Sequence, residues 1–127
     1  MIVVHQYGRN PEEKASLDFS TLKDLDNLLT AFLTTIGIDN DSYEEFDGNL
    51  DVFSEIIADW ICNHPNTNVA FSFKNSLSIE KIEPGLLTAI VQSLNVAEWN
   101  ALSYLVDSKA DCHPLSFYET RQFHFFL

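Results

Sequence analysis

Residues 20–61 read STLKDLDNLLTAFLTTIGIDNDSYEEFDGNLDVFSEIIADWI. Leucine, phenylalanine and isoleucine recur at helical spacing in the first half of this stretch, and Gly37 follows them, where a left-handed residue would end a helix. A helix capped by Ser20 and ending near Ile36 is therefore expected. After a polar segment, Asn49 is placed to cap a second helix. The apolar face of that second helix carries Phe53, Ile56, Ile57, Trp60 and Ile61.

Runs of β-branched and aromatic residues on both sides of these helices predict strands. The three runs are Met1–Tyr7, Asn68–Phe73 and Gln122–Leu127. Between the last two, Pro84 is suited to a helix start, and Asn95 with Glu98 three residues further on resembles a capping box. Two further helices are therefore expected in that region.

The order of these elements predicts the fold class. Crossovers of this length usually join parallel neighbours, with helices packed on the sheet. We therefore expect an α/β fold in one domain, residues 1–127, with a small three-stranded parallel sheet packed by about four helices. An antiparallel sheet with helices on one face is the alternative, because periodicity does not determine strand direction.

The composition favours a cytoplasmic protein with no membrane segment. The chain has 127 residues and is 46% hydrophobic, but it contains no run near the roughly 20 apolar residues that a membrane span needs. Its first residues, MIVVHQYG, lack the basic region and cleavage site of a signal peptide. Cys62 and Cys112 are expected to be reduced thiols.

The distribution of charge points to a basic partner. The net charge of -12 repels nucleic-acid phosphate, so direct nucleic-acid binding is not expected. Between Lys23 and Lys74 there is no lysine or arginine, while acidic residues are frequent. A protein surface rich in arginine and lysine would complement this segment.

Three of these acids share one face of the second helix. Asp51, Glu55 and Asp59 follow i, i+4, i+8 spacing. Like charges at that spacing cost an isolated helix roughly 0.2–0.5 kcal/mol per pair, so their presence is consistent with a role in binding basic groups. The alternative is a solvated face whose charge is balanced from elsewhere in the fold. The balancing bases would be residues such as Lys81, Lys109 or Arg121.

Residues 17–38 (LDFSTLKDLDNLLTAFLTTIGI) and 42–60 (SYEEFDGNLDVFSEIIADW) resemble the first helix, acidic loop and second helix of the barstar family. The most specific part is Asn49-Leu50-Asp51, an acid at Glu55 and an aromatic at Trp60. The resemblance implies a small parallel three-stranded sheet packed by helices. It also implies a non-catalytic inhibitor or immunity protein, without cofactor or metal, that blocks the active site of a basic ribonuclease or toxin domain.

The same resemblance implies that the loop and the second helix bind the partner. The implied partner-binding residues are Tyr43, Glu45, Phe46, Asp47, Asn49, Asp51, Glu55, Asp59 and Trp60. The sequence differs from the family pattern in three places, one of which is Glu55, a longer acid than the aspartate of the family. Residues 45–48 (EFDG) replace paired aromatics followed by glycine, and Ser54 stands where a tryptophan is common.

Other functions compete with this interpretation. An enzyme would use Asp51 with Glu55, or His64 near Cys62, as acid/base or nucleophilic groups, but no catalytic motif accompanies them. A zinc site would use Cys62, His64, Cys112 and His113, at a spacing unlike that of known zinc fingers. An acidic interaction module or nucleic-acid mimic would bind another basic protein. Duplex mimicry needs charge along an extended face, whereas here it concentrates in one loop and one helix.

Overall fold

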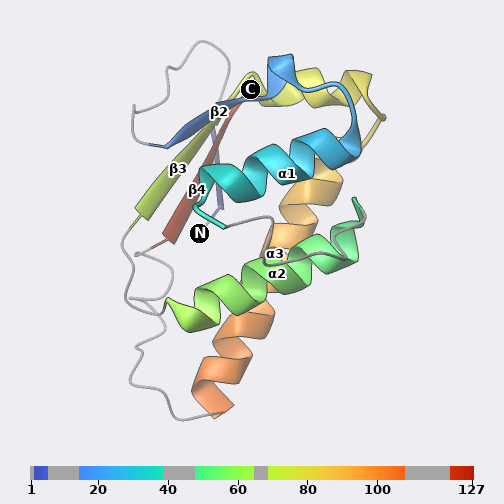
Figure 1. Cartoon of the computed structure of the whole chain (residues 1–127). Coiled ribbons are helices and arrows are strands. Elements are labelled where there is room, and N and C mark those ends of the chain that lie inside the picture. Colours follow the sequence, from blue (N-terminus) through green and yellow to red (C-terminus); the bar gives the residue numbers. More distant parts are fainter. Residues whose placement is uncertain (1, 6–14, 39–47, 65–68, 108–120) are drawn as a thin grey trace.

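The computed structural model describes residues 2–5, 15–38, 48–64, 69–107 and 121–127. Four parallel strands form one sheet in the order β1-β4-β3-β2. The strands are β1 (Ile2–His5), β2 (Ser16–Asp18), β3 (Val69–Lys74) and β4 (Arg121–Phe126). The helices are α1 (Leu25–Thr35), α2 (Leu50–Asn63) and α3 (Leu86–Asp107), with the 3-10 helices η1 (Phe19–Thr21) and η3 (Ser76–Lys81). All three α-helices lie on one face of the sheet (Figure 1).

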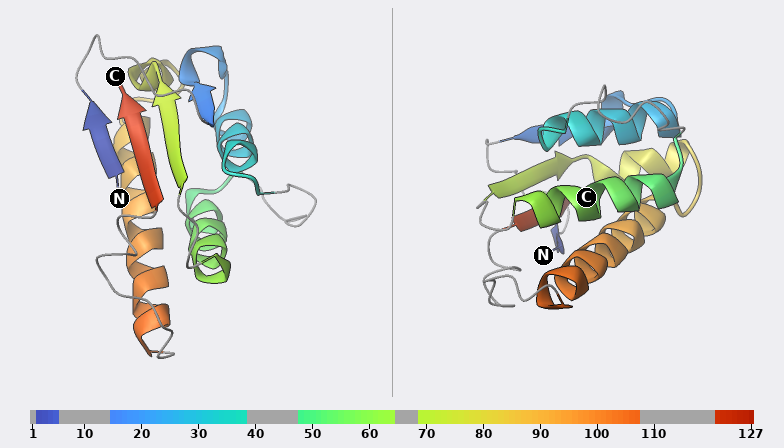
Figure 2. Two further views of the ribbon diagram at one scale, coloured as in Figure 1. Left: turned by 90° about the vertical axis from the view of Figure 1, so that its left-hand side faces the viewer. Right: turned by 60° about the horizontal axis from the view of Figure 1, so that its bottom comes forward.

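The predicted α/β class and the parallel sheet are confirmed, and the antiparallel alternative is wrong. The left view of Figure 2 shows the arrows of the sheet pointing the same way, with β1 and β2 at the two edges. The sheet has one strand more than predicted. This strand, β2, pairs with β3 through Leu17 and Phe73. It was missed because it is three residues long and too short to show alternation.

The first helix begins later than the sequence suggested. Asp24, not Ser20, is the N-cap of α1, and its carboxylate accepts a hydrogen bond from the Asn27 backbone N–H (2.7 Å). The predicted end is confirmed, since Gly37 has φ +84°. The Gly37 N–H donates to the Thr34 carbonyl and the Ile38 N–H to the Leu33 carbonyl, which is a Schellman ending.

Residues 86–107 form one continuous helix, so the expected second helix starting at Asn95 is wrong. Glu98 lies in the middle of α3 and is only 6% exposed. The apolar face continues past Asn95 because Leu94, Ala97 and Ala101 are all buried. The helix start is held instead by Glu80, whose carboxylate accepts from the N–H groups of Gly85 (2.5 Å) and Leu87 (3.1 Å).

Phenylalanine side chains fill the space between the helices and the sheet. Phe73 of β3 is fully buried, and its ring centroid lies 4.3 Å from that of Phe32 on α1 and 5.1 Å from that of Phe125 on β4. Phe53 of α2 meets Phe32 edge to face, with centroids 5.2 Å apart. This cluster ties two helices to the central strands, which fixes the position of α2 relative to the sheet.

The other face of the sheet carries two histidines in contact. His5 Nε2 lies 2.9 Å from His124 Nδ1, and His124 Nε2 lies 2.8 Å from Gln122 Oε1. Because the amide oxygen only accepts, His124 donates to it from Nε2. The His5 ring also stacks on Phe126, with centroids 4.2 Å apart. These contacts link edge strand β1 to β4.

Asp18 joins the edge strand β2 to the turn after β3. Its carboxylate accepts from the Ser20 hydroxyl (2.6 Å), the Ser20 backbone N–H (3.0 Å) and Asn75 Nδ2 (3.0 Å). These hydrogen bonds, foremost those from the Ser20 and Asn75 side chains, lower the pKa of Asp18, and nearby Lys74 adds to the effect. Asn75 itself has φ +54°, a conformation that asparagine tolerates well.

We expect Asp18→Asn to lower the free energy of unfolding by about 0.5–1 kcal/mol at pH 7, because hydrogen bonds to a charged acceptor are the stronger ones. Because the pKa of Asp18 is lower in the folded state, its ionisation stabilises the fold at pH values above the unfolded-state pKa of about 3.9. This contribution is lost as the pH falls through the folded-state pKa. Urea unfolding at pH 7 and pH 3 should therefore show the difference shrinking at pH 3. An equal loss at both values would contradict this account.

Candidate functional site

Helix α2 is anchored at its start by local hydrogen bonding. Asn49 is its N-cap, as predicted, and the Asn49 side-chain oxygen accepts from the Asp51 N–H (2.7 Å). Gly48 precedes it with φ +63°, and a Cβ added there would lie 3.4 Å from the Asp26 side chain. The amide oxygen of Asn49 is therefore committed to the helix end, and Asp51 stands in the first turn, where a carboxylate is favourable.

The buried face of α2 fixes which residues remain outside. Phe53 and Ile57 are fully buried, and Ser54, the residue at the position where the family often has tryptophan, is buried as well. The Ser54 hydroxyl donates to the carbonyl of Ser93 on α3 (3.1 Å). Since these residues occupy one side of the helix, the opposite side is presented to solvent.

Asp51, Glu55 and Asp59 lie on that exposed side, and we call them the acidic stripe. At a rise of about 1.5 Å per residue, successive carboxylates are spaced by about 6 Å along the helix axis. Within the described residues, no ion pair or side-chain hydrogen bond holds any of the three carboxylates. Lys81 does not neutralise them, while the Lys109 and Arg121 side chains lie outside the described residues. Among the residues that the structure describes, the stripe is exposed to solvent and has no cationic side chain bound to it.

Trp60 belongs to the core. It is only 9% exposed, and its ring lies 5.9 Å from Phe71 and 5.7 Å from the His64 ring, centroid to centroid. His64 Nδ1 donates to the Trp60 carbonyl (2.8 Å), which satisfies an acceptor at the end of α2. Trp60 positions the end of the helix, and a partner contact through its exposed edge stays a prediction.

The structure brings together the helical part of the predicted site. Asn49, Asp51, Glu55, Asp59 and Trp60 are all carried by α2 and its cap. The loop part lies outside the described residues. Those loop residues are Tyr43, Glu45, Phe46 and Asp47.

Cys62 and His64, which were considered for catalysis and metal binding, have other partners. The Cys62 thiol lies 3.9 Å from the Ala101 carbonyl oxygen, and the His64 ring bonds the Trp60 carbonyl. In the described part of the chain, no group of three or more His, Cys, Asp or Glu side chains is arranged to hold a metal ion. Cys112 and His113 of the suggested zinc site lie outside it.

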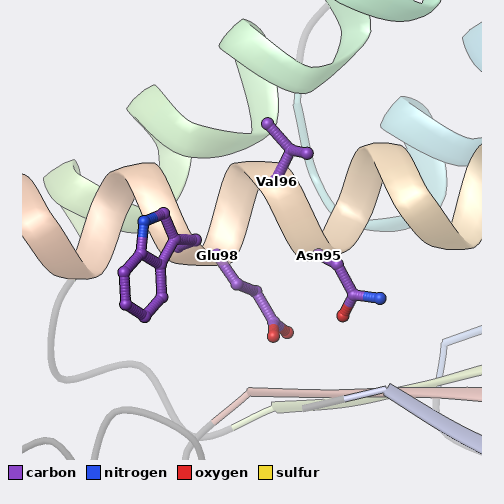
Figure 3. Close-up of a pocket in the computed structure, with 4 residues that line it drawn as sticks. Asn95, Val96 and Glu98 are labelled. Atoms are coloured by element: carbon purple, nitrogen blue, oxygen red, sulfur yellow. The ribbon is translucent and has the colours of Figure 1, made fainter.

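Two open pockets flank α3, and sequence reasoning identified neither. One, of about 400 Å³, is lined by Asn95, Val96, Glu98 and Trp99. Figure 3 shows Asn95 and Glu98 pointing toward the side of α3 that faces the sheet, and Val96 pointing the other way. The second, of about 460 Å³, lies between α2 and α3 and includes Asp59 of the acidic stripe.

The sequence did contain a signal for these pockets. Several large apolar side chains of α3 lie off its buried face. They are Val96, Trp99, Tyr104 and Val106, all more than half exposed. Val96 and Trp99 line the first pocket, and Tyr104 lines the second.

No described helix combines the length and apolar character that crossing a bilayer requires.

Comparison with known proteins gives no family model, no curated protein and no solved structure that matches the chain. The fold and the site together define an α/β protein that carries three exposed carboxylates along one helix packed on the sheet.

Proposed function

We propose that this protein is a non-catalytic inhibitor of the barstar type, which binds and blocks the active site of a basic ribonuclease or toxin nuclease. The observation that carries the proposal is the acidic stripe: Asp51, Glu55 and Asp59 are exposed, aligned and without an ion pair in the described residues. Carboxylates fixed on a rigid helix can bind arginine and lysine by charge-assisted hydrogen bonds. A ribonuclease active site offers such cations, because it must bind RNA phosphate.

The arrangement of the strands also supports the proposal. The family resemblance implies three parallel strands joined by helices, and β1, β4 and β3 form such a group, with α1 and α2 leading into β3 and α3 leading into β4. The short β2 is an addition at the edge next to β3. In this arrangement the stripe is part of a helix packed on a sheet, so little ordering is needed when a partner binds.

The net charge gives the proposed inhibitor a kinetic advantage. A chain of charge -12 attracts a basic partner over several ångströms before contact, and such steering raises association rates by 10–1000-fold, depending on salt.

A solvated acidic face without a partner would show no saturable binding. Binding to a basic domain that is not a ribonuclease would instead favour an interaction module.

A panel of small basic ribonucleases and toxin nucleases provides the test. We expect the purified protein to inhibit at least one member in a one-to-one complex, and the association rate to fall about tenfold between low and moderate salt. Stopped-flow mixing and an RNA-cleavage assay measure both quantities. The proposal fails if no member is inhibited at micromolar protein, or if binding occurs with full nuclease activity retained.

A further inference from the structure

The pocket between α2 and α3 lies beside the acidic stripe and extends it. Its α2 wall includes Asp59 and Asn63, and its α3 wall includes Asn100 and Tyr104. Ala58 and Ala101, one on each helix, also line it. We call this the α2–α3 pocket. Because Asp59 belongs to both features, a partner that covers the stripe also reaches the pocket.

Two contacts hold the pocket walls in place. The Ser54 hydroxyl donates to the Ser93 carbonyl, and the Cys62 thiol lies 3.9 Å from the Ala101 carbonyl oxygen. Both pairs are separated by 39 residues in sequence, so α2 and α3 run in the same direction along their contact. The alanines at this contact are small, which lets the helices approach and leaves room above them.

The pocket has the electrostatics of a cation site. Asn63 is the last residue of α2, so the pocket lies beside a helix C-terminus, which carries partial negative charge. Neither α2 nor α3 has a basic residue in its last turn. The Asp59 carboxylate adds a full negative charge, and Asn63 and Asn100 each supply an amide oxygen as a hydrogen-bond acceptor.

Tyr104 adds a flat aromatic surface to this site. It is 62% exposed, and it lies one turn after Asn100 on the same helix. A guanidinium group stacks on an aromatic ring and has five N–H donors for several acceptors at once, whereas an ammonium is a compact and strongly hydrated charge. The combination of a carboxylate, amide oxygens and an exposed ring therefore suits arginine better than lysine.

We propose that the α2–α3 pocket binds an arginine side chain of the basic partner, with the guanidinium paired to Asp59 and stacked on Tyr104. The inference rests on the proposed function in one respect, that the partner is a basic protein. The aliphatic part of the arginine lies over Ala58 and Ala101, and its N–H groups donate to Asp59 and to the amide oxygens of Asn63 and Asn100. The stripe attracts basic residues in general, whereas the pocket selects an arginine at one position of the partner surface.

The first test uses N-acetyl-arginine methylamide as the probe in ¹⁵N–¹H NMR titrations of the whole chain. We expect saturable shifts of the Asn63 and Asn100 side-chain NH₂ signals, several-fold weaker binding of the lysine analogue, and no binding of the uncharged citrulline analogue. Tyr104→Ala and Asp59→Asn should abolish the response. Trp99→Ala removes an equally exposed aromatic of α3 outside the pocket and should preserve it.

Three outcomes would overturn the inference. The first is equal response to the arginine and lysine probes, and the second is a response that survives Tyr104→Ala. The third is a concentration-dependent shift of the same signals without probe, which would mean that a second copy of the chain occupies the pocket.

A second measurement separates this inference from the proposed function. Against a ribonuclease that the protein inhibits, Tyr104→Ala should weaken binding about tenfold, while Trp99→Ala leaves it unchanged. Inhibition unaffected by Tyr104→Ala would overturn the pocket inference and leave the proposed function standing. If the arginine probe binds but no ribonuclease is inhibited, the proposed function is contradicted. The pocket would then be supported as an arginine site for another basic protein.

Discussion

Phe73→Ala is expected to lower the free energy of unfolding by about 4 kcal/mol, a large fraction of the roughly 5–15 kcal/mol that holds a domain of this size together. Phe73 is fully buried at the centre of the sheet. Its ring contacts those of Phe19, Phe32 and Phe125. Alanine would therefore leave a cavity bordered by η1, α1 and β4 at once, where rigid neighbours collapse poorly.

Urea denaturation followed by circular dichroism measures this loss. Trp99→Ala is the matched control, because it removes a larger aromatic side chain that is 65% exposed. We expect the control to change stability by less than about 0.5 kcal/mol. A loss below about 1 kcal/mol for Phe73→Ala would mean that the phenylalanine cluster does not form the core described above.

Removing two charges from the acidic stripe is expected to have the largest effect on function. In Asp51→Asn/Glu55→Gln each side chain keeps its size and loses its charge. A hydrogen bond to a charged group contributes about 2 kcal/mol, so the double variant should bind an inhibited ribonuclease about a thousandfold more weakly. Titration calorimetry with that ribonuclease measures the change.

The stability of the same variant should hardly change. The i, i+4 repulsion between Asp51 and Glu55 is relieved, while the favourable position of Asp51 in the first helical turn is lost, so the two effects nearly cancel within about 0.5 kcal/mol. Glu83→Gln/Asp107→Asn is the matched control, since it removes two exposed charges before and at the end of α3. Equal loss of binding in both double variants would show that overall charge, and not the stripe, attracts the partner.

The parts of the site that the sequence could predict are those set by local geometry. The i, i+4 spacing of Asp51, Glu55 and Asp59 places them on one face of any helix. Asn49 is a favoured N-cap residue and so indicates where the helix begins. Trp60 was harder to interpret. Its spacing places it on the apolar face, and only its contacts with Phe71 and His64 reveal how little of the ring is exposed.

The errors arose where tertiary packing overrides a local signal. Asn95 and Glu98 match a capping box, yet α3 continues through them because Ala97 and Ala101 extend its buried face. Strand β2 exists because β3 offers an edge and Asp18 bonds Asn75, a contact between residues 57 apart in sequence. The α2–α3 pocket likewise depends on how the two helices are aligned, which no single segment encodes.

The most direct test of the central proposal is competition with RNA for a ribonuclease that the protein inhibits. Cleavage of a short fluorogenic RNA is measured at several substrate concentrations with increasing amounts of the protein. If the acidic stripe occupies the phosphate-binding groups, inhibition is competitive: the apparent KM rises with inhibitor while kcat stays constant. A lowered kcat with unchanged KM, or a complex that cleaves RNA at the normal rate, would contradict the proposal that the stripe blocks the active site.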